Sequence, residues 1–278
     1  MGGFSLDWSY VRNDIAEHAR TCVYDRAGYG WSESVESPQT SEDIARDLHE
    51  LLKGGGESGP YLLIGHSAGG FYVRAFAQQS PNEVAGMVLL DSSHENQGLV
   101  LTSLKPLEDQ QLSQLNTCSL LSPTGLMRVF RVHDSTVPDD VPLTEEEVEA
   151  WLGHLYQTAF CSTVAREFEV LQRETREDHP PLPIGDIPLV VLTRDVMQDE
   201  VPEGLGIDAA VFQEAGQAGL ELQQELAQLS TDGRHQIAAE SGHYIHWDQP
   251  GIVVDVIVEM VSVFRSSVGQ SAADANRP

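Results

Sequence analysis

The chain has 278 residues, of which 43 are acidic and 16 are basic, so its formal net charge is −27. This length is enough to bury a sizeable core and falls within the range of a single domain. The negative charge argues against proteins that bind nucleic acids or anionic membranes, because both partners are held through lysine and arginine.

No apolar run reaches the roughly 18 residues that span a bilayer, and residues 1–10 lack the basic and apolar regions of a signal peptide. We therefore predict a soluble, cytoplasmic protein with neither a membrane nor a nucleic acid as partner. A secreted protein stays open as the alternative if a leader precedes the given start. The sequence does not determine the oligomeric state.

Short apolar segments alternate with helical patterns along the chain, as expected of an α/β protein with a parallel sheet. The predicted strands are residues 21–24, 61–64, 87–90, 187–192 and 234–238.

Capping-box patterns and apolar spacing mark the helices. Thr40-x-x-Asp43 and Thr144-x-x-Glu147 each predict a helix start. We assign residues 1–94 and 186–265 to the core and residues 95–185 to an inserted helical cap. The polar residues 266–278 are predicted to be disordered.

The three cysteines are Cys22, Cys118 and Cys161. Their number is odd, and they show neither a C-x-x-C pair nor Cys/His ligand spacing. The sequence therefore predicts no disulfide, no metal site and no cofactor. Cys22 lies in a predicted strand and is expected to be a small core residue.

A G-x-S-x-G pentapeptide, Gly65-His66-Ser67-Ala68-Gly69, follows one predicted strand and precedes a helical pattern at 71–79. A strained strand-turn-helix elbow of this kind exposes a serine nucleophile. The pentapeptide alone is weak evidence, and the alternative is a tight turn with an ordinary surface serine.

A serine nucleophile needs a base, and His243 is the candidate. It lies on a loop after the last predicted strand, next to Gly242, well downstream of Ser67. His246 is three residues further on and is the less favoured alternative.

Several motifs in the expected order resemble the α/β-hydrolase superfamily, closest to the bacterial branch that carries a YDRAGYGWS segment. The resemblance covers most of the chain and rests on residues 8–11, 24–32, 60–70, 84–94 and 241–250. It implies a mostly parallel sheet flanked by helices and the chain order Ser, acid, His. It leaves the substrate open.

The resemblance offers two places for the acid of the triad. Asp91 ends the predicted strand 87–90 and is favoured, while Asp195 and Asp199 follow strand 187–192. The Gly-x-x-Asp pattern usual after that later strand is missing, because position 194 is arginine.

An oxyanion needs two preorganised donors. The resemblance implies the N–H of Ala68 and a second donor from Gly2-Gly3, which matches the loop after the third strand. The first three strands of the fold then have no counterpart, most simply because the amino terminus is truncated. We expect strands 21–24 and 61–64 either to pair directly or to leave a gap.

These features predict a serine hydrolase that cleaves a small to medium carboxylic ester through an acyl-enzyme, with a small-molecule ester as its partner. An amidase, a lactonase or a C–C bond hydrolase could use the same residues. Epoxide hydrolases and haloalkane dehalogenases are disfavoured, because their chemistry takes an aspartate nucleophile where this chain has Ser67. A non-catalytic ligand-binding protein of the same fold is the alternative from another class.

Overall fold

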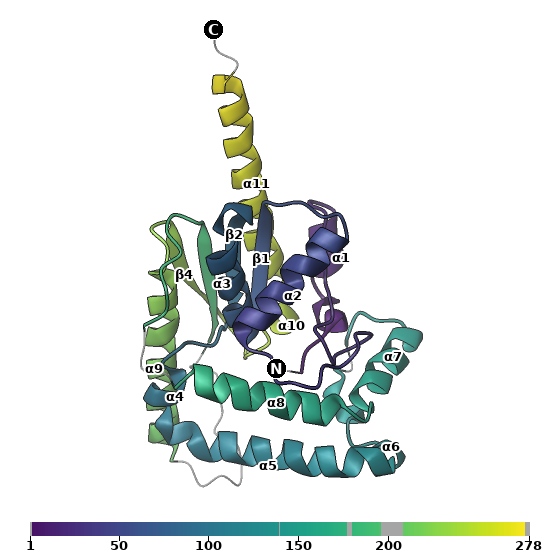
Figure 1. Cartoon of the computed structure of the whole chain (residues 1–278). Helices are drawn as coiled ribbons and strands as arrows, with labels where there is room; N and C mark the ends of the chain where they lie inside the picture. The colour runs from purple at the N-terminus through teal and green to yellow at the C-terminus, as the bar shows by residue number, and fades with distance from the viewer. Residues whose placement is uncertain (1, 139, 177–179, 196–207, 276–278) are drawn as a thin grey trace.

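The computed structural model describes residues 2–138, 140–176, 180–195 and 208–275 (Figure 1). Its centre is a parallel sheet whose strands lie side by side in chain order: β1 (Tyr61–His66), β2 (Val84–Leu90), β3 (Leu189–Arg194) and β4 (Gly233–Ala238). Leu90 pairs with both His66 and Leu192, so the first three strands end near one level. The four predicted strands from residue 61 onwards are confirmed.

The predicted strand at 21–24 is wrong. These residues form no strand, and Cys22, expected in the core, is an exposed free thiol. The sheet begins at β1, which pairs on its outer side with no strand of the described chain. An extended segment becomes a strand only where a neighbour pairs with its backbone, and sequence propensity cannot supply that neighbour.

Helices of the core cover both faces of the sheet. They are α1 (Arg12–Ala16), α2 (Ser41–Gly54), α3 (Gly69–Gln79), α9 (Ala209–Ala227), α10 (Ile245–Asp248) and α11 (Pro250–Ala275).

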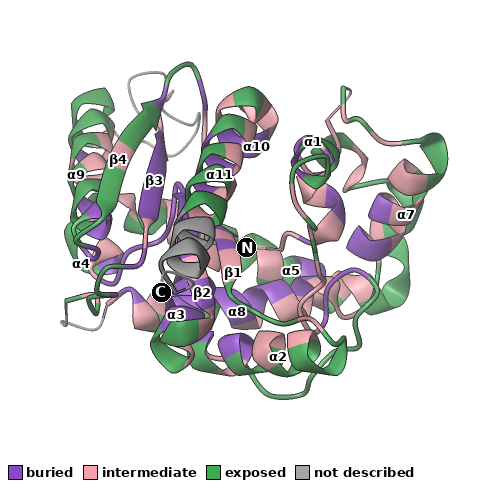
Figure 2. Ribbon diagram, turned by 90° about the horizontal axis from the view of Figure 1, so that it is seen from above, coloured by how far each residue is buried: buried purple, intermediate pink, exposed green. Residues whose placement is uncertain are grey.

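Alternate side chains of a strand point to opposite faces, and this sorts the core into two halves. Met87 and Leu89 pack on the face covered by α2, α3 and α9. Val88 and Leu90 pack on the face covered by α1, α10 and α11. Figure 2 shows that β3 is almost wholly buried while the edge strand β4 is mostly exposed. The result is a three-layer α/β/α core.

The segment between β2 and β3 contains helices and no strand among its described residues. Its helices are α4 (Gln97–Val100), α5 (Lys105–Leu121), α6 (Leu126–Val129), α7 (Glu145–Leu155) and α8 (Phe160–Glu174). Short 3-10 helices complete the chain: η1 (Ser5–Trp8), η2 (Pro81–Glu83), η3 (Thr102–Leu104), η4 (Ser122–Thr124) and η5 (Asp134–Thr136). Both predicted capping boxes form, at the starts of α2 and α7.

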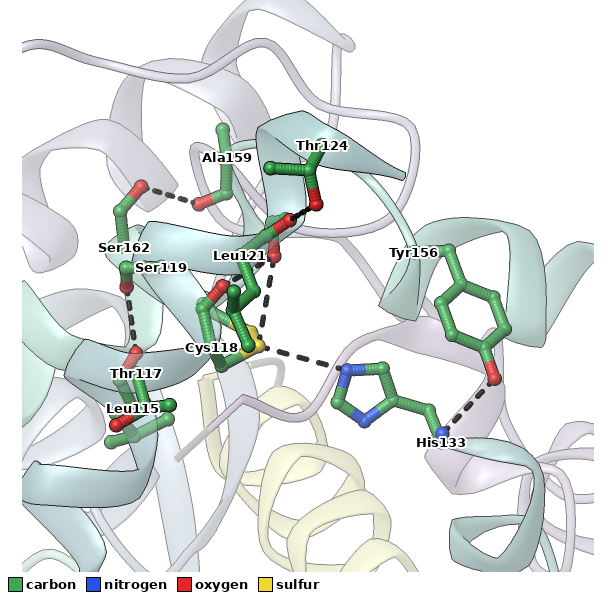
Figure 3. The surroundings of a disulfide bond; sticks show 12 residues. Leu115, Thr117, Cys118, Ser119, Leu121, Thr124, His133, Tyr156, Ala159 and Ser162 are labelled. Atoms are coloured by element: carbon green, nitrogen blue, oxygen red, sulfur yellow. Dashed lines mark hydrogen bonds between the residues drawn. A yellow bond between two sulfur atoms is a disulfide. The ribbon is translucent and has the colours of Figure 1, made fainter. Parts of the chain in front are cut away.

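A disulfide between Cys118 and Cys161 joins α5 to α8, so the prediction of no disulfide is wrong. The two helices run side by side beneath the sheet (Figure 1), which brings the Cα atoms to 5.8 Å. That separation suits a disulfide. Figure 3 shows the His133 ring pointing at the Cys118 sulfur, 3.8 Å from Nε2. A pairing across 43 residues depends on helix packing, which residue spacing alone does not reveal.

The carboxyl-terminal helix is longer than expected. The sequence predicts disorder from residue 266, whereas α11 continues to Ala275 and projects beyond the sheet (Figure 1). Alanine is the best helix former, and the segment 266–275 contains three alanines and no proline.

A buried carboxylate, Glu167 of α8, ties the cap to the core. It accepts hydrogen bonds from Arg26 Nη2 at 2.7 Å, Tyr29 Oη at 2.5 Å and Tyr72 Oη at 2.6 Å. Burial would raise the pKa of Glu167, but the Arg26 guanidinium and the two phenols outweigh burial and lower that pKa to about 2. One carboxylate thus joins α8, α3 and the segment that carries Arg26 and Tyr29.

Replacing Glu167 with glutamine should destabilise the protein by about 3 to 5 kcal/mol, because the buried Arg26 charge loses its partner. Urea unfolding at pH 7 measures this. The folded pKa lies below the ordinary 4.5, so this stabilisation is complete above about pH 4.5 and is lost as the pH falls towards 2. The difference between wild type and variant should shrink over that range.

The matched control is Glu169→Gln, an exposed glutamate on the same helix, which should change stability by less than about 0.5 kcal/mol. Equal losses for the two variants would contradict a special role for the Glu167 contacts.

Candidate active site

Ser67 lies at the sharp turn between β1 and α3. Its φ is 55°, a left-handed conformation that residues other than glycine rarely adopt. Two backbone hydrogen bonds hold the turn against the neighbouring strand end. The Ser67 N–H donates to the Leu90 carbonyl and the Ser93 N–H donates to the Ser67 carbonyl, both at 3.0 Å. The serine is therefore fixed beside the carboxyl end of β2.

Two glycines around Ser67 allow the close approach that this turn needs. A Cβ on Gly65 would lie 2.5 Å from the Gly69 carbonyl oxygen. A Cβ on Gly70 would lie 1.7 Å from Ser92 Oγ and 2.6 Å from its Cβ. Gly69 is different, since a Cβ there would meet nothing within 4 Å.

Asp91 follows β2 directly and also has a positive φ, 38°. Its buried carboxylate meets His243, whose Nδ1 lies 2.6 Å from Asp91 Oδ2. Strain of this kind persists only where the surroundings fix it, and it is common at functional sites. The structure thus brings together the favoured acid and the favoured base, which are 152 residues apart in the chain.

Arg194, the last residue of β3, is the second partner of Asp91. Its Nη1 lies 2.6 Å from the same Oδ2, and its backbone N–H donates to Oδ1 at 3.4 Å. Burial would raise the pKa of the Asp91 carboxyl, but the His243 hydrogen bond and the Arg194 charge outweigh burial and hold that pKa below its usual value. Asp91 is therefore ionised at neutral pH.

The alternative acids are placed differently. Asp195 Oδ2 accepts from the Glu240 N–H at 3.3 Å, and the Asp195 N–H donates to the Ser241 carbonyl at 3.0 Å. Asp195 therefore supports the loop that carries His243. Asp199 lies outside the described residues.

Two further histidines lie around His243. His66 Nε2 donates to the His243 carbonyl at 2.8 Å, and burial holds the pKa of His66 well below its usual value. His246, the other candidate base, is buried in α10 and stacks on Trp8 at 4.8 Å between ring centroids. Burial lowers its pKa to about 3, so it is a neutral core residue at pH 7. Sequence reasoning assigned no role to His66, although it lies within the pentapeptide.

The hydrogen bonds of the described residues include none between the Ser67 hydroxyl and His243. Such contacts are commonly long in unliganded enzymes and tighten when substrate binds.

The candidate oxyanion donors do not all have free N–H groups. The Gly2 N–H, a predicted oxyanion donor, donates to Glu167 Oε2 at 3.4 Å and is therefore engaged within the protein. The neighbouring Gly3 carbonyl accepts from Arg26 Nη1 at 3.5 Å. In the part of the chain that the structure describes, no hydrogen bond engages the N–H of Gly3 or Ala68.

One group of three metal-binding side chains occurs among the described residues: Cys118, His133 and Cys161 of the cap. The two sulfurs are bonded to each other in the disulfide. No described helix is long and apolar enough to cross a membrane.

Comparison with known proteins identifies the family of this chain. The sequence model of the alpha/beta hydrolase family matches residues 1–256. The chain therefore belongs to the α/β-hydrolase family, as the motifs predicted.

Two curated relatives show how far the sequence similarity extends. An AB hydrolase superfamily protein of Gibberella zeae is 27% identical over 283 residues, covering 93% of this chain and 83% of the relative. An uncharacterised protein of Schizosaccharomyces pombe is 35% identical over 134 residues. That match covers 45% of this chain and only 23% of the yeast protein.

Solved structures share the fold at low sequence identity. A thermophilic esterase from Thermogutta terrifontis matches with a TM-score of 0.62 and 18% identity, covering 94% of this chain and 86% of the esterase. An epoxide hydrolase from Vigna radiata matches with a TM-score of 0.64 and 14% identity, covering 94% and 88% of the two chains. Both similarities concern the fold.

Replacing Gly70 with alanine should destabilise the protein by about 1 to 3 kcal/mol, because the new Cβ would overlap Ser92 close to its backbone. Gly69→Ala is the matched control, since its Cβ has open space and alanine favours a helix over glycine. Thermal unfolding compares the two. A Gly70 variant as stable as the Gly69 variant would show that the turn has more room than the structure indicates.

Proposed function

We propose that the protein is a serine hydrolase that cleaves a small to medium carboxylic ester through an acyl-enzyme. The single observation that carries this proposal is the 2.6 Å contact between Asp91 Oδ2 and His243 Nδ1 at the edge where Ser67 stands on its elbow. The serine, the aspartate and the histidine come from three separate segments of the chain: the turn after β1, the end of β2 and the loop after β4.

The roles follow from which atoms are occupied. His243 Nδ1 carries a proton donated to Asp91, so Nε2 is left to take the proton from Ser67 Oγ as that oxygen attacks the ester carbonyl. The imidazolium then returns the proton to the departing alkoxide, leaving an acyl group on Ser67. Water, activated by the same histidine, hydrolyses the acyl-enzyme. Ionised Asp91 orients the ring and stabilises its charged form.

The developing oxyanion requires two donors. We assign the N–H groups of Ala68 and Gly3, because no hydrogen bond of the described residues engages either. Gly2 is better placed in a supporting role, since its N–H already donates to Glu167.

The fold is compatible with other hydrolytic chemistry, because an epoxide hydrolase is among its structural neighbours. Ser67 favours an ester here, since epoxide opening in this fold uses an aspartate at the elbow. An amide, a lactone or a C–C bond beside a ketone would use the same three residues.

A non-catalytic ligand-binding protein is the second candidate. The observation that favours it is the lack of a hydrogen bond between the Ser67 hydroxyl and His243 among the described contacts. A binding protein would need neither an ionised acid nor an activated serine.

Ser67→Ala and His243→Ala should each lower kcat on p-nitrophenyl acetate by roughly 10³-fold or more. Catalytic residues of this kind act as a unit, so removing one of them removes most of the rate enhancement of the group. The folded state should remain, as judged by circular dichroism. Exposed residues of the same types, Ser113→Ala and His18→Ala, serve as controls and should leave kcat unchanged. A rate near that of wild type for either site variant would exclude the proposed roles.

Asp91→Asn should reduce kcat by up to about 10⁴-fold, because an amide at this position favours the wrong histidine tautomer. Asp195→Asn should have a much smaller effect, since its carboxylate contacts the Glu240 backbone. Steady-state kinetics of the two variants decide between them. A larger loss for Asp195→Asn would move the acid to the end of β3.

A further inference from the structure

Position 194 is where the chain departs from the pattern usual after this strand of the fold. The usual glycine is replaced by Arg194, and the structure shows where this side chain goes. It reaches across from the end of β3 to the end of β2 and meets Asp91 Oδ2 at 2.6 Å. The arginine that replaces the usual glycine therefore contacts the proposed acid directly.

The Asp91 carboxylate is held from two directions. Its Oδ2 faces both Arg194 Nη1 and His243 Nδ1, and its Oδ1 accepts the Arg194 backbone N–H. The Asp91 side chain is only 5% exposed, against 29% for Arg194 and 39% for His243. Contacts to both oxygens leave the carboxylate little freedom to rotate.

The buried Asp91 carboxylate also needs a compensating charge. A buried carboxylate is costly unless it is paired, and a neutral imidazole brings no compensating charge. The guanidinium is charged at every working pH, so it supplies that compensation before any reaction begins. Among the residues that the structure describes, the charged and titratable side chains in contact with the Asp91 carboxylate are thus one permanent cation from β3 and one imidazole from the loop after β4.

We propose that Arg194 is a positioning residue, which keeps the Asp91 carboxylate ionised and turned towards His243 Nδ1. This inference rests on the proposed function, because it assigns Arg194 a role in the same triad. In this arrangement the acid follows β2, and the positive charge that compensates it comes from the end of β3.

The test compares Arg194→Met, which keeps the aliphatic stem, with Arg194→Lys, which keeps the charge but not the planar fork. Loss of a charged hydrogen bond predicts that kcat on p-nitrophenyl acetate falls about 10- to 100-fold in Arg194→Met, with KM within about threefold. Arg194→Lys should recover part of kcat. The control is Arg234→Ala on the adjacent strand, which breaks an exposed pair with Glu259 and should leave kcat unchanged.

A second measurement does not depend on turnover. A proton held between His243 and Asp91 should give a low-field ¹H NMR signal in wild type that disappears in Asp91→Asn. The signal should be lost or shifted in Arg194→Met and retained in Arg194→Lys and Arg234→Ala.

The two measurements separate the proposals. A protein without esterase activity whose low-field signal still depends on Arg194 would overturn the proposed function and leave Arg194 as the residue that positions Asp91. An unchanged signal together with an unchanged kcat in Arg194→Met would overturn the role of Arg194. If Arg194→Met does not fold, Arg194→Lys still tests it: loss of the planar fork should lower kcat below the wild-type value, whereas a structural role alone would leave kcat unchanged.

Discussion

The site depends on the two turns that follow the carboxyl ends of the adjacent parallel strands β1 and β2. β1 and β2 end level, and each is followed by a residue in the left-handed region, Ser67 and Asp91. Backbone hydrogen bonds join the two turns directly, from Ser67 to Leu90 and from Ser93 to Ser67. Neither turn can relax without disturbing the other, so the strain of both is fixed by the ladder and by close packing at Gly70.

A series of contacts between charged and polar side chains links the ends of β3, β2 and β4 at this edge of the sheet. Arg194 on β3 pairs with Asp91 after β2, and Asp91 contacts His243 on the loop after β4. His66, immediately before Ser67, donates to the His243 carbonyl and so fixes the loop from the β1 side. Each strand end thus constrains a neighbour, and a histidine far along the chain gains a defined position relative to the serine.

Sequence reasoning succeeded where the signal was local. The elbow around Ser67, the capping boxes and four of the five strands are patterns within a few residues. The family resemblance favoured Asp91 as the acid over Asp195 and Asp199, and Asp91 lies beside His243 in the structure. Features that depend on distant contacts were missed. In the sequence, position 194 stood out only because the usual glycine is missing there. Its contact with Asp91 was not predicted, since the two residues are 103 positions apart. The disulfide and the Gly2 contact with Glu167 depend on how the cap packs.

The most direct test of the account is the reaction of the intact protein with a fluorophosphonate probe, with the modified residue mapped by mass spectrometry. An activated serine predicts stoichiometric labelling of Ser67, with none at this position in Ser67→Ala and strongly slowed labelling in His243→Ala. Folded protein that stays unlabelled, or that is labelled equally fast without His243, would contradict the claim that this edge of the sheet activates a nucleophile.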